Sequence, residues 1–115
     1  MKILPFSVFA LLLTACGSLN HVAFSGESGS FGGDNILRND TFKYIAMMED
    51  AAFSCRNIRS VKSRIIKQAM ENGLPRSYEE WQVQACGQSH LYDVQFKGDA
   101  RGETDFTVGL HRKDP

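Results

Sequence analysis

The sequence predicts a small α+β domain in which one N-terminal helix packs on an antiparallel sheet of three to four strands, with one disulfide. Apolar residues recur at helical spacing between residues 40 and 55. Three later segments alternate apolar and polar residues with the period of two that half-buried strands show. A cysteine at the end of the helical segment and another in the first alternating segment could join the helix to the sheet.

The expected helix begins near Asn39 or Asp40, either of which is a suitable N-cap. Two apolar stripes follow at helical spacing, one made of Phe42, Ile45, Met48 or Glu49, and Ala52, the other of Tyr44, Met48, Ala51 and Cys55. Two stripes predict a helix that is buried on much of its surface. Cys55 ends it, facing the same way as Tyr44 and Met48.

The next segment, residues 58–72, fits either a helix or a strand. Its apolar residues keep helical spacing, and Gly73 followed by Pro75 would stop a helix. The alternation of apolar and charged residues around Ser63 and Arg64 suits a half-exposed strand instead. We prefer the strand slightly, because a sheet gains stability from more than three strands.

Three strands are expected after Tyr78. Their inward residues are Trp81, Val83 and Ala85, then Tyr92, Val94 and Phe96, then Phe106, Val108 and Leu110. Residues 87–89 would turn the first hairpin and residues 97–103 the second. Cys86 has the opposite parity from Ala85, so either a bulge at Gly87 turns it inward or the disulfide closes at the rim of the sheet.

Length and charge restrict the functional classes. The 115 residues allow one domain at most, and 13 Lys and Arg residues balance 13 Asp and Glu residues. Because the net charge gives no general attraction for polyanions, we expect no nucleic-acid partner.

The N-terminus has the form of a signal peptide covering residues 1–15. Lys2 precedes an apolar run from Ile3 to Leu13, which is too short to span a bilayer. The run leads into Leu13-Thr14-Ala15-Cys16, which resembles the lipobox of bacterial lipoproteins. The resemblance implies cleavage before Cys16, acylation of its thiol and amino group, and permanent attachment to a membrane.

Two further expectations concern this anchor. Gly17 stands where inner-membrane lipoproteins carry Asp, so the resemblance implies a bacterial outer membrane, with the domain facing the periplasm or the cell surface. The alternative is an ordinary secretory peptide cleaved near Ala15, which leaves Cys16 as a thiol or a disulfide partner. Residues 16–35 are rich in Gly and Ser and predict a flexible tether, followed by the domain at residues 36–115.

Cys55 and Cys86 are the only cysteines left to pair if Cys16 carries lipid. Export into an oxidising compartment favours a disulfide, which would close a loop of about thirty residues and stabilise the fold by roughly 3–4 kcal/mol. A free thiol at Cys86 with His90 as its base is a second reading. A metal site with His90 is a third, although the spacing fits no known ligand pattern; we expect neither a metal nor a cofactor.

The segment WQVQACGQSHLYDVQF, followed by ETDFTV, resembles the W-x-V-x-A-C-G-x4-Y-x-V-x-F and T-x-F-x-V pattern of small bacterial lipoproteins and exported proteins. The resemblance covers about residues 40–110. It implies a fold with a helix that ends in Cys, and it carries no catalytic residue.

Five basic residues and no acidic one lie between Arg56 and Lys67. Four of them, Arg59, Lys62, Arg64 and Lys67, are candidates for contact with an envelope protein or an anionic polymer, although a solvated face whose charges are balanced by acidic residues elsewhere is the simpler explanation. We therefore expect a non-enzymatic binding or structural module on a lipid anchor. The alternative is a small hydrolase or thiol-dependent enzyme that uses Cys86 and His90.

The lipid anchor is tested by Cys16→Ser, which removes the thiol on which the expected lipid modification begins. We expect the variant to leave the membrane fraction and to incorporate no labelled palmitate. Label that persists in the variant would contradict the lipoprotein assignment.

Overall fold

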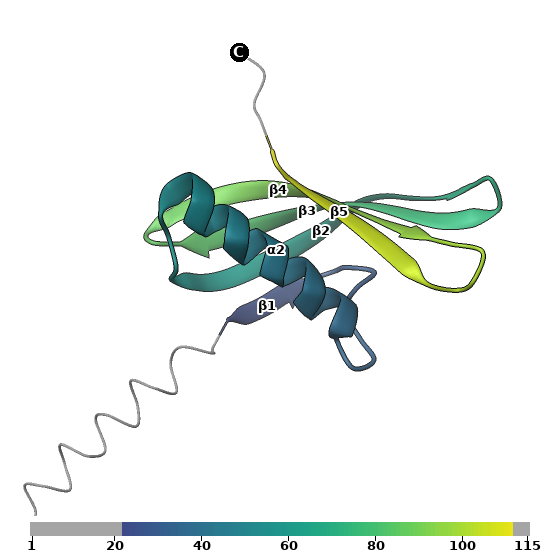
Figure 1. Ribbon diagram of the computed structural model, residues 1–115, viewed down its shortest axis with the longest axis horizontal. Coiled ribbons are helices and arrows are strands. Elements are labelled where there is room, and N and C mark those ends of the chain that lie inside the picture. Colours follow the sequence, from purple (N-terminus) through teal and green to yellow (C-terminus); the bar gives the residue numbers. More distant parts are fainter. Residues whose placement is uncertain (1–21, 112–115) are drawn as a thin grey trace, which may run out of the picture.

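The computed structural model describes residues 22–111, which form one helix and five strands (Figure 1). The elements are β1 (Ala23–Gly26), α2 (Ile36–Phe53), β2 (Ile58–Glu71), β3 (Leu74–Ala85), β4 (Gln88–Gly98) and β5 (Thr104–Leu110). The α+β class with one helix on a sheet is confirmed. The expected number of strands was wrong, because β1 comes from the segment predicted to be a tether. The signal peptide, Cys16 and residues 112–115 lie outside the described part.

The strands follow one another in the order β1-β2-β3-β4-β5, and α2 crosses one face of the sheet (Figure 1). β1 runs parallel to β2, with Ala23 opposite Ser60 and Gly26 opposite Ser63. The other three pairs are antiparallel. Parallel neighbours need a long crossover connection, and α2 provides it between β1 and β2.

Two-residue turns join β2 to β3 and β3 to β4. Asn72 and Gly73 have φ angles of 55° and 77°, and Cys86 and Gly87 have φ angles of 52° and 75°. Positive φ at both central residues is what a type I′ hairpin turn requires. Residues 58–71 are therefore strand, and Gly73 closes a hairpin instead of stopping a helix. The first predicted turn at residues 87–89 was placed one residue too late, and Cys86 belongs to the turn, which explains its parity.

The helix begins at Ile36, earlier than predicted. Asp34 Oδ1 accepts the backbone N–H of Ile36 at 3.2 Å, so an acceptor upstream of Asn39 and Asp40 serves the first turn. The buried residues are Thr41, Ile45 and Glu49. They lie four residues apart on one face.

The expected second stripe was wrong for Tyr44, which is 53% exposed, and for Ala51, whereas Met48 is partly buried against the core. Ala52 of the first stripe is exposed as well. Ser54, in a left-handed conformation, ends the helix, and Cys55 follows it with 1% of its surface exposed. Cys55 thus reaches the core from the chain beyond the helix, and not from a stripe shared with Tyr44.

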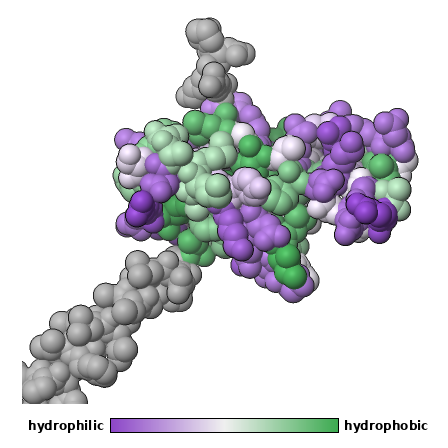
Figure 2. Space-filling model, viewed as in Figure 1, coloured by the Kyte–Doolittle hydropathy of each residue, from purple (hydrophilic) through white to green (hydrophobic). Residues whose placement is uncertain are grey.

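The core lies between α2 and the sheet. Its fully buried members include Trp81, Val83, Tyr92 and Val94 from the central strands, with Ile45 from the helix and Val61 from β2. Figure 2 shows apolar residues gathered over the helix-covered part of the molecule, while the hairpin ends at the right are mostly hydrophilic. Phe106, Val108 and Leu110 of β5 are partly buried against this core, so the inward residues predicted for β3, β4 and β5 are confirmed.

The N-terminal segment adds aromatic rings to this core. The ring centroid of Phe24 lies 5.5 Å from that of Phe42, and that of Phe31 lies 6.0 Å from that of Trp81. Aromatic pairs at such distances stabilise a core beyond their buried area. The expectation of a flexible tether was therefore wrong for residues 22–35, which belong to the folded domain.

A buried carboxylate holds this segment in place. Glu79 of β3 is 2% exposed and faces α2, on the same side of the sheet as Trp81. Its two oxygens accept five hydrogen bonds, from Ser28 Oγ at 2.6 Å, Gly29 N at 2.8 Å, Ser63 Oγ at 3.3 Å, Ser77 Oγ at 2.8 Å and Trp81 Nε1 at 2.9 Å. Burial of a charge is tolerable only with such partners.

The partners of Glu79 come from two sources. Ser63, Ser77 and Trp81 belong to the sheet, whereas Ser28 and Gly29 belong to the loop after β1. Ser28 also accepts the N–H of Ser30 at 3.0 Å. Glu79 therefore binds the N-terminal segment to the centre of the sheet.

The disulfide joins Cys55 to Cys86, as predicted, with Cα atoms 6.1 Å apart. It ties the chain after α2 to the turn between β3 and β4. The bridged residues are 31 positions apart. On the loop-entropy model, closing such a loop stabilises the fold by about 3–4 kcal/mol.

Glu79→Gln tests the role of the buried carboxylate. The amide would present N–H groups to donors, so we expect a loss of about 2–4 kcal/mol in the free energy of unfolding, measured in urea. The matched control is Glu80→Gln on the opposite face of the sheet, where the carboxylate makes one surface ion pair with Arg64; this change should cost less than about 1 kcal/mol. Equal losses in the two variants would contradict the role of Glu79.

Candidate functional site

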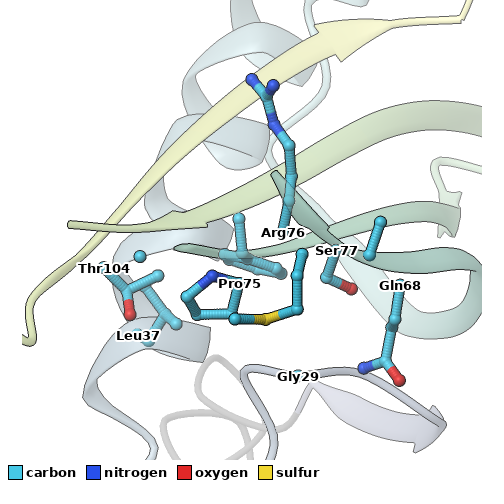
Figure 3. Close-up of a pocket in the computed structure, with 11 residues that line it drawn as sticks. Gly29, Leu37, Gln68, Pro75, Arg76, Ser77 and Thr104 are labelled. Carbon is cyan, nitrogen blue, oxygen red and sulfur yellow. The ribbon is translucent and has the colours of Figure 1, made fainter. Parts of the chain in front are cut away.

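A cavity of about 550 Å³ opens at the end of the sheet where α2 begins (Figure 3). Its wall is formed by the first turn of α2, the loop after β1, and the hairpin ends of β2, β3 and β4. Its apolar lining residues are Leu37, Ala69, Met70, Pro75 and Phe96. The volume falls within the range of small-molecule sites.

Among residues 22–111, Arg76 is the only ionisable residue that lines the cavity, and in Figure 3 its guanidinium extends away from the cavity. Arg76 Nη1 donates to Glu71 Oε1 at 2.7 Å, and Tyr78 donates to Glu71 Oε2 at 2.8 Å. The hydrogen bond from Arg76 lowers the pKa of the Glu71 carboxyl, and that from Tyr78 lowers it further. The apolar residues of this lining suit an apolar group.

The four predicted basic residues differ in the contacts that they make. Arg64 donates to Glu80 Oε1 at 2.5 Å, and the Lys67 ammonium lies 5.7 Å from the centre of the Tyr78 ring. Arg59 and Lys62 are exposed, and no acidic partner within residues 22–111 reaches either of them. Of the four, only Arg64 is paired with an acidic residue within residues 22–111; Lys67 lies over an aromatic ring, and Arg59 and Lys62 make neither kind of contact.

Arg59 and Lys62 lie on β2 beside β1, near the point where the described chain begins. Ala23, the first residue of β1, is opposite Ser60, and Ser25 is opposite Lys62. We call this part of the molecule the basic end. The cavity lies at the other end of the sheet, roughly 25 Å away along β3 at the usual rise per residue.

A second buried carboxylate lies near the disulfide. Glu49 of α2 is fully buried, and its Oε2 lies 2.9 Å from His90 Nδ1. The hydroxyl of Tyr92 donates to the same oxygen at 2.5 Å. Burial raises the pKa of the Tyr92 hydroxyl well above its usual range, and the hydrogen bond to Glu49 adds to the rise. Tyr92 therefore remains a donor, and this cluster ties α2 to β4.

The enzymatic alternative needs a thiol at Cys86 and a base at His90. Cys86 Sγ is bonded to Cys55, and the His90 ring stacks on Phe53 with centroids 3.7 Å apart while its Nδ1 faces Glu49. A thiolate at Cys86 would first require reduction of the disulfide. The alternative stays a prediction, and these contacts give His90 a structural role in the oxidised protein.

Sequence reasoning missed both buried carboxylates and one cluster on the open face of the sheet. Glu49 was placed only as an alternative to Met48, and nothing distinguishes Glu79 from Glu80 except strand parity, with the odd-numbered residues of β3 facing inward. His111 lies 3.0 Å from both oxygens of Asp93. Only the strand register brings these two residues together.

No family model matches the chain, and no curated protein or solved structure matches it. The resemblance to bacterial lipoproteins at residues 13–16, and that of residues 81–96 to exported proteins, stay predictions. Functional inference therefore rests on the residues and contacts described above.

Proposed function

We propose that the protein is a lipid-anchored lipoprotein of the bacterial outer membrane whose domain is a non-enzymatic binding module. Acyl chains at Cys16 would hold it, and the basic end would rest against the anionic headgroups of the same membrane. The observation that carries this proposal is the position of Arg59 and Lys62, unneutralised within residues 22–111, beside the start of β1.

The length of the connecting chain supports this orientation. Only residues 17–21 separate Cys16 from Val22, where the described fold begins. Six residue-to-residue steps span at most about 20 Å when fully extended. The basic end would therefore stay within the reach of lipid headgroups, where each Lys or Arg contributes about 1 kcal/mol.

The anchor itself needs the lipid, or another segment, because no helix within residues 22–111 combines the length and hydropathy that crossing a membrane requires. In this arrangement the cavity faces away from the bilayer. The disulfide and the two buried carboxylates give the domain a rigid frame, as a binding module needs.

The basic end is tested on Cys16→Ser protein, in which acylation cannot hide a weaker contact. We expect it to cosediment with vesicles that contain phosphatidylglycerol, and to do so less in 0.5 M salt, because screening weakens exposed charge pairs. Arg59→Glu with Lys62→Glu should reduce partitioning at least tenfold.

The matched control is Lys97→Glu, an exposed lysine at the opposite end of β4. It should leave partitioning unchanged within about twofold. If both variants bind vesicles like the parent, the basic end does not contact the membrane. Palmitate labelling of the wild-type chain tests the lipid anchor separately.

A further inference from the structure

Three adjacent strands bring two carboxylates and an imidazole together on the sheet face opposite α2. Glu80 of β3 is directly opposite Asp93 of β4, and Asp93 is opposite Gly109 of β5. His111 is two residues beyond Gly109, so it lies on the same face. Its backbone N–H donates to Leu91 O at 2.8 Å, which holds the end of β5 against β4.

We propose that Glu80, Asp93 and His111 bind a zinc ion. One ligand atom from each residue lies within 4.8 Å of the other two, and His111 Nδ1 is 3.0 Å from Asp93 Oδ1. Around tetrahedral zinc, with bonds of about 2.0–2.2 Å, ligand atoms lie about 3.3 Å apart. Small side-chain rotations on a fixed backbone would bring the ligand atoms from their present separations to those that zinc requires.

The donor set determines which cation fits. Zinc accepts imidazole nitrogen together with carboxylate oxygen, whereas calcium and magnesium prefer sites made of oxygen alone. Three protein ligands leave the fourth zinc position to water. The site should therefore bind zinc and discriminate against calcium and magnesium.

Arg64 supports the cluster from the neighbouring strand β2. Its Nη2 donates to Glu80 Oε1, and no residue of the described chain donates to Oε2. Oε2 is therefore available to a cation while Arg64 orients the carboxylate, as partners of metal ligands commonly do. Arg64 pairs with Glu80 alone, so the Asp93 carboxylate, which faces His111, has no Arg or Lys partner within residues 22–111 and can ligate a cation.

This site does not depend on the lipid anchor, although Lys62 of the basic end lies near Glu80 on the same face of the sheet. Its three residues are 13 and 18 positions apart, a spacing that matches no ligand motif. Only the register of three strands assembles it.

The test is zinc titration of the untagged full-length protein, followed by calorimetry. We expect one equivalent of zinc bound with a micromolar Kd, and no binding of calcium or magnesium at millimolar concentration. His111→Ala, Asp93→Asn and Glu80→Gln should each weaken binding at least tenfold. Glu103→Gln, an exposed carboxylate in the loop between β4 and β5, is the matched control and should bind like wild type.

A second measurement on the wild-type protein does not depend on folding of the variants. Zinc should shift the ring nitrogen resonances of His111 in NMR spectra, while those of His90 stay in place. Absence of zinc binding at 100 µM, equal affinity in all variants, or a response at His90 without one at His111 would each overturn the proposal.

Discussion

The buried carboxylate of Glu79 is the constraint on which the N-terminal half of the fold depends. No cation of the described residues pairs with it, so hydrogen-bond donors have to compensate for its burial. The sheet supplies three donors, and Ser28 and Gly29 complete the set. Binding these two residues places β1 beside β2 and brings Phe24 and Phe31 to the core. A Gly- and Ser-rich segment is thereby ordered by polar contacts to Glu79 together with the packing of Phe24 and Phe31.

The docked segment also determines how the domain would lie at a membrane. With β1 in the sheet, the chain from Cys16 enters beside Arg59 and Lys62, and the basic end becomes the end nearest the proposed anchor. The disulfide Cys55–Cys86 and the Glu49–His90–Tyr92 cluster join helix and sheet at this same end. The end of the domain nearest the proposed anchor is thus held together by a disulfide and by a buried hydrogen-bonded cluster.

The sequence predicted the parts of the structure that depend on periodicity and on cysteine count. Trp81, Tyr92 and Phe106 mark strands because their neighbours alternate, and Cys55 pairs with Cys86 as expected. The tether prediction for residues 22–35 was wrong, because a segment rich in Gly and Ser is ordered when a specific acceptor such as Glu79 binds its hydrogen-bond donors. The start of the helix was placed too late, because Asn39 and Asp40 are suitable N-caps but lie within the helix. The cluster of Glu80, Asp93 and His111 could not be predicted from the sequence, because the register of the strands, and not the spacing of the residues, brings them together.

The central claim is that Glu79 holds the loop after β1 as part of the folded domain. Native-state hydrogen exchange of backbone amides tests it most directly, because the Gly29 N–H donates to Glu79. We expect the Gly29 amide to be protected and to exchange by an opening whose free energy approaches that of the sheet residue Trp81. Exchange of Gly29 at the rate of an unstructured peptide, with Trp81 still protected, would contradict the account.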